Sequence, residues 1–170
     1  MGIAFYQVDS RTVGRKAMET NSSPKTLEEV LGRFERALDT PVISGELPQW
    51  CENAERACNE VEKQFHKAVR ENHTPLLEEI YAADPELATR VEQIRKTDGE
   101  LVQRLAQMQE VLHGLTDAAT VVERDEVRLD DQVEDAIQAG LELVMAVRRQ
   151  EVTLTTWHGE ALERDRGPVD

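Results

Sequence analysis

Apolar residues recur every three or four positions through most of this chain, the spacing that places them on one face of an α-helix. The most regular stretch steps by four and three residues from residue 87 to residue 112, as the seam of a helical bundle does. Its members are Leu87, Val91, Ile94, Asp98, Leu101, Leu105, Met108 and Leu112. No stretch alternates apolar and polar residues as strands do, so the pattern predicts an all-α fold.

Proline residues mark the ends of the first two predicted helices. Pro24 suits the first turn of a helix behind a serine cap, and this helix ends before Pro41. A loop up to Pro48 precedes the second helix. Pro75 either ends that helix, so that a new one starts, or kinks it on its way to Tyr81.

Two further helices complete the pattern. Asp84 and Pro85 form a cap and first-turn pair that opens the third helix, and Gly114 is expected to end it. The fourth helix follows the acidic run 123–131 and frays from Gly159 onward. Its predicted inward stripe is Val133, Ile137, Leu141, Val144, Arg148, Val152, Thr155 and Leu162.

The length of 170 residues is that of one ordinary domain, large enough to bury a substantial core. Four amphipathic helices joined by short breaks favour packing around that single core. We therefore predict one up-down four-helix bundle over residues 23–167. An N-terminal arm, residues 1–22, precedes it, and a short tail, residues 168–170, follows it.

Charge and cysteine content restrict the partners and the location. The chain carries 34 acidic against 20 basic side chains, and its net charge of -14 repels phosphate backbones, so no nucleic-acid partner is expected. No segment holds the roughly 18 apolar residues that span a bilayer, so no membrane partner is expected either. Cys51 and Cys58 fall on one predicted helix about 10 Å apart, too far to bond to each other. Unpaired thiols fit a cytoplasmic protein.

Charged residues occupy positions where the seams call for apolar ones. An unpaired carboxylate at Asp98 would cost several kcal/mol in a core, so it needs a cation, a metal, a polar network or water. Arg148 lies on the fourth stripe with Glu151 nearby, and a buried polar cluster of Asp98, Arg148, Arg149 and Glu151 is the economical hypothesis. The alternative is a locally splayed bundle in which these groups reach water.

Metal binding is a second interpretation of the polar residues. Glu62 and His66 are four residues apart on a helical stripe that continues to His73. This stripe lies more than about 100° from the centre of the apolar face, so we expect it to point outward as a surface histidine pair. If a metal is bound, the candidate ligands are Glu62, His66, Asp98 and Glu151.

Two segments resemble the hemerythrin-like family. They are LLEEIYAADPELATRVEQIRKTDGELVQRLAQMQEVL and RRQEVTLTTWHGEALERDRG, and the resemblance covers roughly residues 50–167. It implies the four-helix bundle fold and, in complete members, a di-iron centre in the bundle core. Thr97 and Asp98 stand where the family's third helix carries a Glu-His pair.

Most other ligand positions of that family carry different residues here. No histidine lies between Leu27 and Asp39 in the first helix. The second-helix pair falls on Gln64 and Ala68 or on His66 and Arg70, and the fourth-helix pair on Arg148 or Arg149 and Thr153 or Leu154. The resemblance therefore implies the fold without the cofactor.

The sequence also has no glycine elbow around a nucleophile and no phosphate-cradling loop, so we expect no enzyme. The leading hypothesis is a metal-free, non-catalytic hemerythrin-like bundle that serves as a structural or protein-interaction module. Its partner would be a second copy, joined through Trp50, Trp157 or the apolar arm, or another protein. The alternative is an iron protein with an altered ligand set for oxygen, nitric oxide or iron sensing or storage. An unrelated helical adaptor or chaperone is a third interpretation.

Overall fold

The computed structural model describes residues 26–43, 45–121 and 126–165, so the predicted arm 1–22 and tail 168–170 lie outside the described residues. Within these ranges the chain is helical with short connections and contains no strand, which confirms the all-α prediction. The elements are α1 Leu27–Asp39, α2 Leu47–Ala68, the π-helix η1 Val69–His73, α3 Thr74–Ala83, the 3-10 helix η2 Pro85–Leu87, α4 Ala88–Thr120 and α5 Glu126–Asp165.

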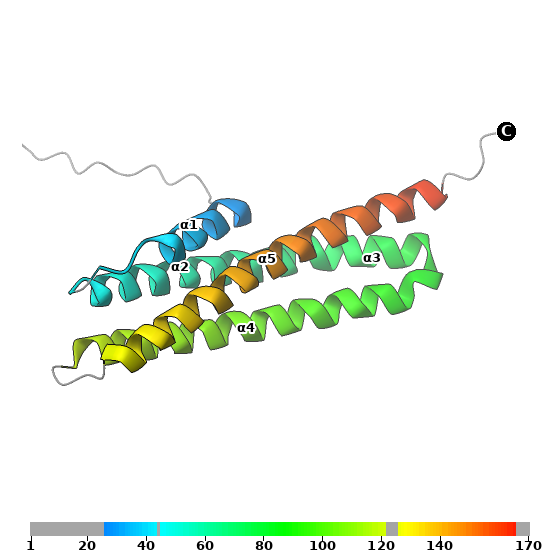
Figure 1. The fold of residues 1–170 in the computed structure, drawn as a ribbon. Helices are drawn as coiled ribbons and strands as arrows, with labels where there is room; N and C mark the ends of the chain where they lie inside the picture. The colour runs from blue at the N-terminus through cyan, green and yellow to red at the C-terminus, as the bar shows by residue number, and fades with distance from the viewer. Residues whose placement is uncertain (1–25, 44, 122–125, 166–170) are drawn as a thin grey trace, which may run out of the picture.

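The elements build four rods, because α2, η1 and α3 continue into one another without a break in the described chain. The loop between α1 and α2 lies at the same end of the molecule as the last turn of α4 and the first turn of α5 (Figure 1). The turn between α3 and α4 lies at the opposite end (Figure 1). The second predicted helix therefore continues past Pro75 rather than stopping there.

Local side chains explain where the first and third helices start. Thr26 and Glu29 form a capping box before α1: the threonine hydroxyl accepts from the Glu29 N–H at 3.2 Å, and the Glu29 carboxylate accepts from the Thr26 N–H at 2.9 Å. The helix thus starts at Leu27, later than the predicted start at Pro24. Asp84 caps η2 as predicted, accepting from the Glu86 N–H at 3.0 Å.

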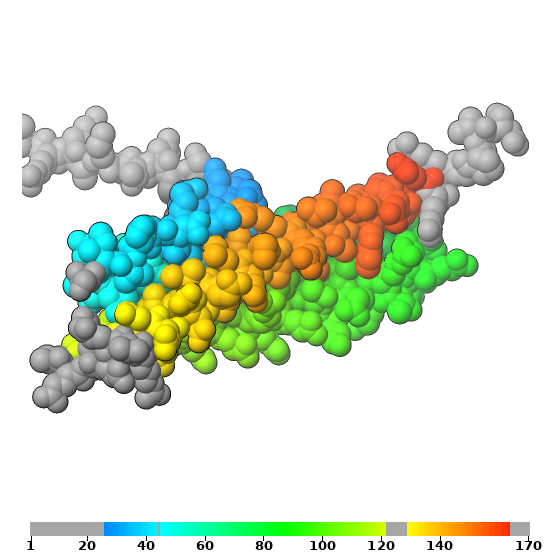
Figure 2. Space-filling view, viewed as in Figure 1, coloured from blue at the N-terminus to red at the C-terminus, as the bar shows by residue number. Residues whose placement is uncertain are grey.

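The first rod is much shorter than the others. α1 has 13 residues and contacts α2 and α5, whereas α5 has 40 residues. Figure 2 shows α1 over one half of the molecule on this face, and Figure 1 shows α3, α4 and α5 in the other half. The buried residues accordingly form two apolar clusters, a larger one that includes α1 and a smaller one without it. The smaller cluster is Leu77, Ile80, Leu87, Val91, Ile94, Leu154 and Ala161.

The third predicted helix does not end at Gly114. α4 continues to Thr120, and a Cβ built on Gly114 would meet nothing within 4 Å. A glycine inside a helix costs only about 0.5–1 kcal/mol relative to alanine, and burial of Leu115 and Ala119 in the next two turns offsets that cost.

The predicted stripe of the fourth helix is rotated from the buried one. Val133 and Val144 are buried, but Val152 is 65% exposed and Leu162 is 42% exposed. Two steps of four residues add about 80° at 100° per residue, so Val152 lies well away from Val144 and leaves the core side. The buried side of α5 carries Leu129, Val133, Ala136, Gly140, Leu143, Val144, Val147, Gln150, Leu154 and Ala161.

Gly140 marks the place where the buried face of α5 comes closest to α1. A Cβ at this position would lie 2.6 Å from Leu38 Cδ1 and 3.4 Å from the Phe34 ring, both on α1. Leu38 and Phe34 are themselves fully buried, so they have little space to move into. The absence of a side chain at Gly140 lets α1 approach α5 closely.

Two glycine-to-alanine substitutions test this contact. Gly99→Ala in α4 has open space around its Cβ and should stabilise the fold by about 0.5–1 kcal/mol. Gly140→Ala gains the same helix propensity but overpacks Leu38, and should be less stable than Gly99→Ala by about 1–3 kcal/mol. Urea unfolding measures both, and equal stabilities would show that α1 does not pack tightly against α5.

Candidate functional site

The register of the second rod changes at η1, and this change brings His73 into the core. The Thr74 N–H and the Thr74 hydroxyl both bond to the Val69 carbonyl, five residues back, the latter at 2.9 Å. Pro75 lacks an N–H and its ring crowds the preceding turn, so an ordinary helical turn is disfavoured here. The π-turn accommodates one extra residue, and the buried face moves from Ala68 to His73 in a step of five.

His73 therefore points inward, and the prediction that its stripe faces outward is wrong at this position. Its side chain is 1% exposed. The sequence contains one signal for this change, the proline two residues later, because π-turns arise where a helix must absorb a local conflict. Nothing in the periodicity distinguishes a π-turn from a kink.

His73 lies between two carboxylates from different helices. Its Nδ1 is 3.0 Å from Oδ2 and 3.1 Å from Oδ1 of Asp98 on α4. Its Nε2 is 2.6 Å from Oε1 of Glu151 on α5. Gln150 completes the network by donating from Nε2 to Asp98 Oδ1 at 2.7 Å and to the Ile94 carbonyl at 3.1 Å. Three helices are thus joined at one buried point.

The carboxylates hold His73 as an imidazolium. Burial lowers the pKa of His73, but the hydrogen bonds and charges of Asp98 and Glu151 outweigh burial and raise that pKa to about 9. Both ring nitrogens then donate. Glu151 is 37% exposed, so water solvates the second negative charge, while Asp98 is 4% exposed and is satisfied by His73 and Gln150. The edge of the network packs against Phe65, whose ring centre is 5.8 Å from that of His73.

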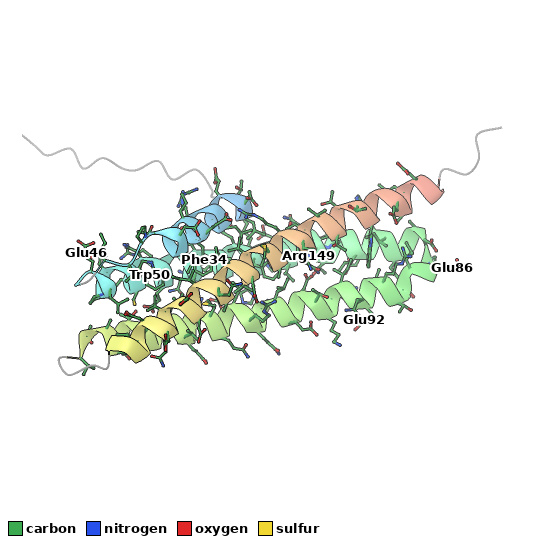
Figure 3. All side chains as sticks on the ribbon, in the orientation of Figure 1. Phe34, Glu46, Trp50, Glu86, Glu92 and Arg149 are labelled. Atoms are coloured by element: carbon green, nitrogen blue, oxygen red, sulfur yellow. The ribbon has the colours of Figure 1, made fainter. Side chains whose placement is uncertain are left out.

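The predicted pairing of Asp98 with Arg148 or Arg149 is wrong. Arg148 faces α1, where its guanidinium is 2.8 Å from Glu28 and 2.9 Å from Glu35. Arg149 is exposed on α5 (Figure 3). Positions 148 and 149 lie about 200° and 100° around the helix from Gln150, so neither reaches Asp98. Of the predicted cluster, the structure brings together only Asp98 and Glu151, and it adds His73 and Gln150.

The four candidate metal ligands fall in two separate places. Glu62 and His66 lie 4.0 Å apart on α2, where His66 is exposed and Glu62 is half-buried and accepts from Gln109 Nε2 of α4 at 2.6 Å. Asp98 and Glu151 bind opposite nitrogens of one imidazole ring, so one ion cannot take all three groups. Among the described residues no cluster of three or more histidine, cysteine or acidic side chains has metal-binding geometry.

The cysteines and tryptophans belong largely to the core. Burial raises the pKa of Cys51 to about 11 and that of Cys58 to about 12, so both thiols are unreactive at neutral pH. Trp50 is 5% exposed, and the Trp157 ring lies 5.5 Å from the Arg90 guanidinium. Trp50 therefore cannot form the exposed interface that the sequence suggested.

A groove between α4 and α5 is the second feature with a functional shape. Its volume is about 570 Å³. Met108, Leu115 and Ala136 are buried in it, and Val111 is 47% exposed. The remaining lining residues are small or polar, and none of the lining residues is basic: Glu110, Gly114, Ala118, Gln132, Asp135 and Ala139.

Comparisons of this chain with models of protein families, with curated proteins and with solved structures find no match. Over the residues that the structure describes, no helix is both long and apolar enough to cross a bilayer.

The pH dependence of stability tests the His73 network. Because its pKa is raised, His73 should contribute stability fully below about pH 6.5 and lose it as the pH rises through about 9. Urea unfolding of the wild type should therefore lose about 3 kcal/mol over this range relative to His73→Gln, at 1.36 kcal/mol per pKa unit. His66→Gln, on the outer face, is the control and should keep the wild-type slope. Identical slopes in His73→Gln and wild type would contradict the assignment.

Two alanine variants separate the buried network from the surface pairs. Asp98→Ala leaves a buried imidazolium with one partner lost and should reduce the free energy of unfolding by about 3–5 kcal/mol. Arg148→Ala breaks contacts of a side chain that is 33% exposed and should cost less than about 1 kcal/mol. Thermal and urea melts at pH 6 measure both, and comparable losses would mean that the two sites are equally buried.

Proposed function

We propose that this protein is a metal-free, non-catalytic interaction module, a hemerythrin-like up-down bundle whose α4–α5 groove binds an amphipathic helix with basic flanks. The groove is the observation that carries the proposal. Val111 exposes apolar surface there, above the buried Met108 and Leu115, between two helices that lie side by side, as in helix-binding grooves.

The lining of the groove favours a helix as the occupant. Gly114, Ala118, Ala136 and Ala139 project little from α4 and α5, so a third backbone can approach closely. A partner helix with apolar residues at every third and fourth position would cover the exposed valine and the buried floor at once.

Charge favours a basic partner. Glu110 and Asp135 line the groove without a lysine, arginine or histidine among its residues, and the whole chain carries a net charge of -14. Lysine or arginine residues beside the apolar stripe would meet these carboxylates and would speed association at low salt.

The polar network supports a structural rather than a catalytic role for the bundle centre. Every strong donor and acceptor of His73 and Asp98 is used within the network, and the ring has no free nitrogen. The hemerythrin-like part of the proposal is supported by Asp98, which faces the bundle interior at the position where the resemblance places a ligand. The alternating directions of the rods in Figure 1 support the up-down arrangement.

One observation favours the competing iron protein. Glu62 and His66 lie one turn apart on α2, 4.0 Å from each other. Elemental analysis of untagged protein from iron-supplemented cells distinguishes the two functions. Near-stoichiometric iron would overturn the metal-free proposal, and its absence together with peptide binding would favour the interaction module.

Peptide binding tests the groove directly. The probe is a fluorescent synthetic peptide with leucine at every third and fourth position and lysine at both flanks, titrated with the protein by anisotropy. Val111→Glu should weaken binding about tenfold or more, because it buries a charge in the apolar contact. Val152→Glu, another exposed valine on a long helix outside the groove, is the matched control and should bind as wild type does. Equal weakening by both variants, or no binding by the wild type, would contradict the proposal.

A further inference from the structure

A separate cavity lies at the corner where α1 meets the first turns of α2. Its volume is about 330 Å³. α1 and the loop that follows it contribute Arg33, Arg36, Ala37, Thr40, Pro41 and Ile43, and the start of α2 contributes Glu46, Gln49, Trp50 and Asn53. None of these residues lines the α4–α5 groove.

Trp50 is the unexplained residue of this cavity. Its side chain is 5% exposed, and its indole Nε1 is buried without a hydrogen-bond partner in the part of the chain that the structure describes. An indole N–H is only a donor, and buried tryptophan N–H groups usually have an acceptor. Among the buried side-chain nitrogen and oxygen atoms of the described residues, the Trp50 indole nitrogen is the one without a hydrogen-bond partner. An acceptor that reaches this nitrogen would satisfy it.

The cavity has two cations that are only weakly engaged by carboxylates. Arg36 forms no ion pair within 4.0 Å among the described residues, although its charge helps to lower the pKa of the neighbouring Glu35. Arg33 makes one long contact, 3.4 Å, with Glu60. A guanidinium presents several N–H donors in a planar fork that matches the oxygens of a carboxylate or a phosphate. Two such groups one turn apart on α1 can face a single oxyanion.

The start of α2 adds further donors. Its cap residue, Glu46, lines the cavity but makes no side-chain cap bond, and the first turn contains no acidic residue, while Pro48 there has no N–H to donate. Backbone N–H groups at a helix start carry partial positive charge that favours an anion. Asn53 uses its oxygen to accept from Gln49 at 3.3 Å and from Arg56 at 3.5 Å, so its own amide N–H groups remain as donors. Glu46 and Trp50 lie together at this end of α2 (Figure 3).

We propose that this corner cavity binds a small oxyanion, a phosphate or carboxylate group, held by Arg33 and Arg36 and by the Trp50 indole N–H. The anion neutralises cations of α1 and supplies the acceptor that the buried indole lacks. Because α1 is a short rod of 13 residues whose main contacts are with α2 and α5, a ligand bridging α1 and α2 also strengthens the attachment of α1.

The indole signals of the two tryptophans give the test. The ¹H–¹⁵N spectrum of the full chain is recorded during titration with inorganic phosphate, with sodium acetate and with sodium chloride at equal ionic strength. The Trp50 signal should shift in a saturable manner with phosphate or acetate but not with chloride, and the Trp157 signal should stay in place. A shift of the Trp50 signal with phosphate alone, or with acetate alone, identifies which oxyanion the cavity binds.

Two variants with the same charge change make the test specific. Arg36→Gln should weaken binding of the oxyanion about tenfold, because the substitution removes a charged donor while the buried face of α1 is unchanged. Arg95→Gln, on α4 outside the cavity, is the control and should keep wild-type affinity. The proposal is overturned if neither oxyanion shifts the Trp50 signal more than chloride does, or if both variants lose the shift equally. A failed peptide titration leaves this result unaffected, because the two sites share no residue.

Discussion

The imidazolium of His73 between Asp98 and Glu151 is the contact on which the middle of the bundle depends. On each of three rods the polar residue falls between the two apolar clusters: His73 between Phe65 and Leu77, Asp98 between Ile94 and Leu101, and Gln150 between Val147 and Leu154. A buried network that is fully bonded fixes the relative heights of the helices that carry it, because any slip would leave a charge without a partner. It thereby sets the register of one cluster against the other.

The short length of α1 determines which surfaces of the other helices stay uncovered. α1 covers α2 and α5 in one half, and Gly140 allows it to pack closely against α5. The α4–α5 groove and the corner cavity both lie in this half, on different helix pairs. The buried polar network thus joins the helices in the core, while the groove and the cavity lie at the surfaces between rods.

The sequence locates most of the buried apolar positions, but it does not identify the residues that bond to Asp98, the charged residue among them. Asp98 is recognisable because it interrupts an otherwise regular run from Leu87 to Leu112. Its partner His73 is not recognisable, because one extra residue in η1 turns His73 inward. The stripe predicted for the fourth helix is also misplaced, because Ala136 and Gly140 stand at buried positions where larger apolar residues would be expected. Small residues carry little periodic signal although they mark the closest helix contacts. The pattern consequently predicts the wrong neighbour for Arg148, and it contains no signal for Gln150, which bonds to Asp98.

By itself the sequence determined the class of structure, since helical spacing of apolar residues and the cap at Asp84 depend only on local chemistry. It also indicated a buried charge, because burying Asp98 follows from its position in a seam. Only the tertiary structure decided which groups meet that charge, where α1 stops covering its neighbours and which grooves stay open. Those outcomes depend on rotations of about 100° per residue summed over long helices, so a single inserted residue or a missing side chain changes every contact beyond it.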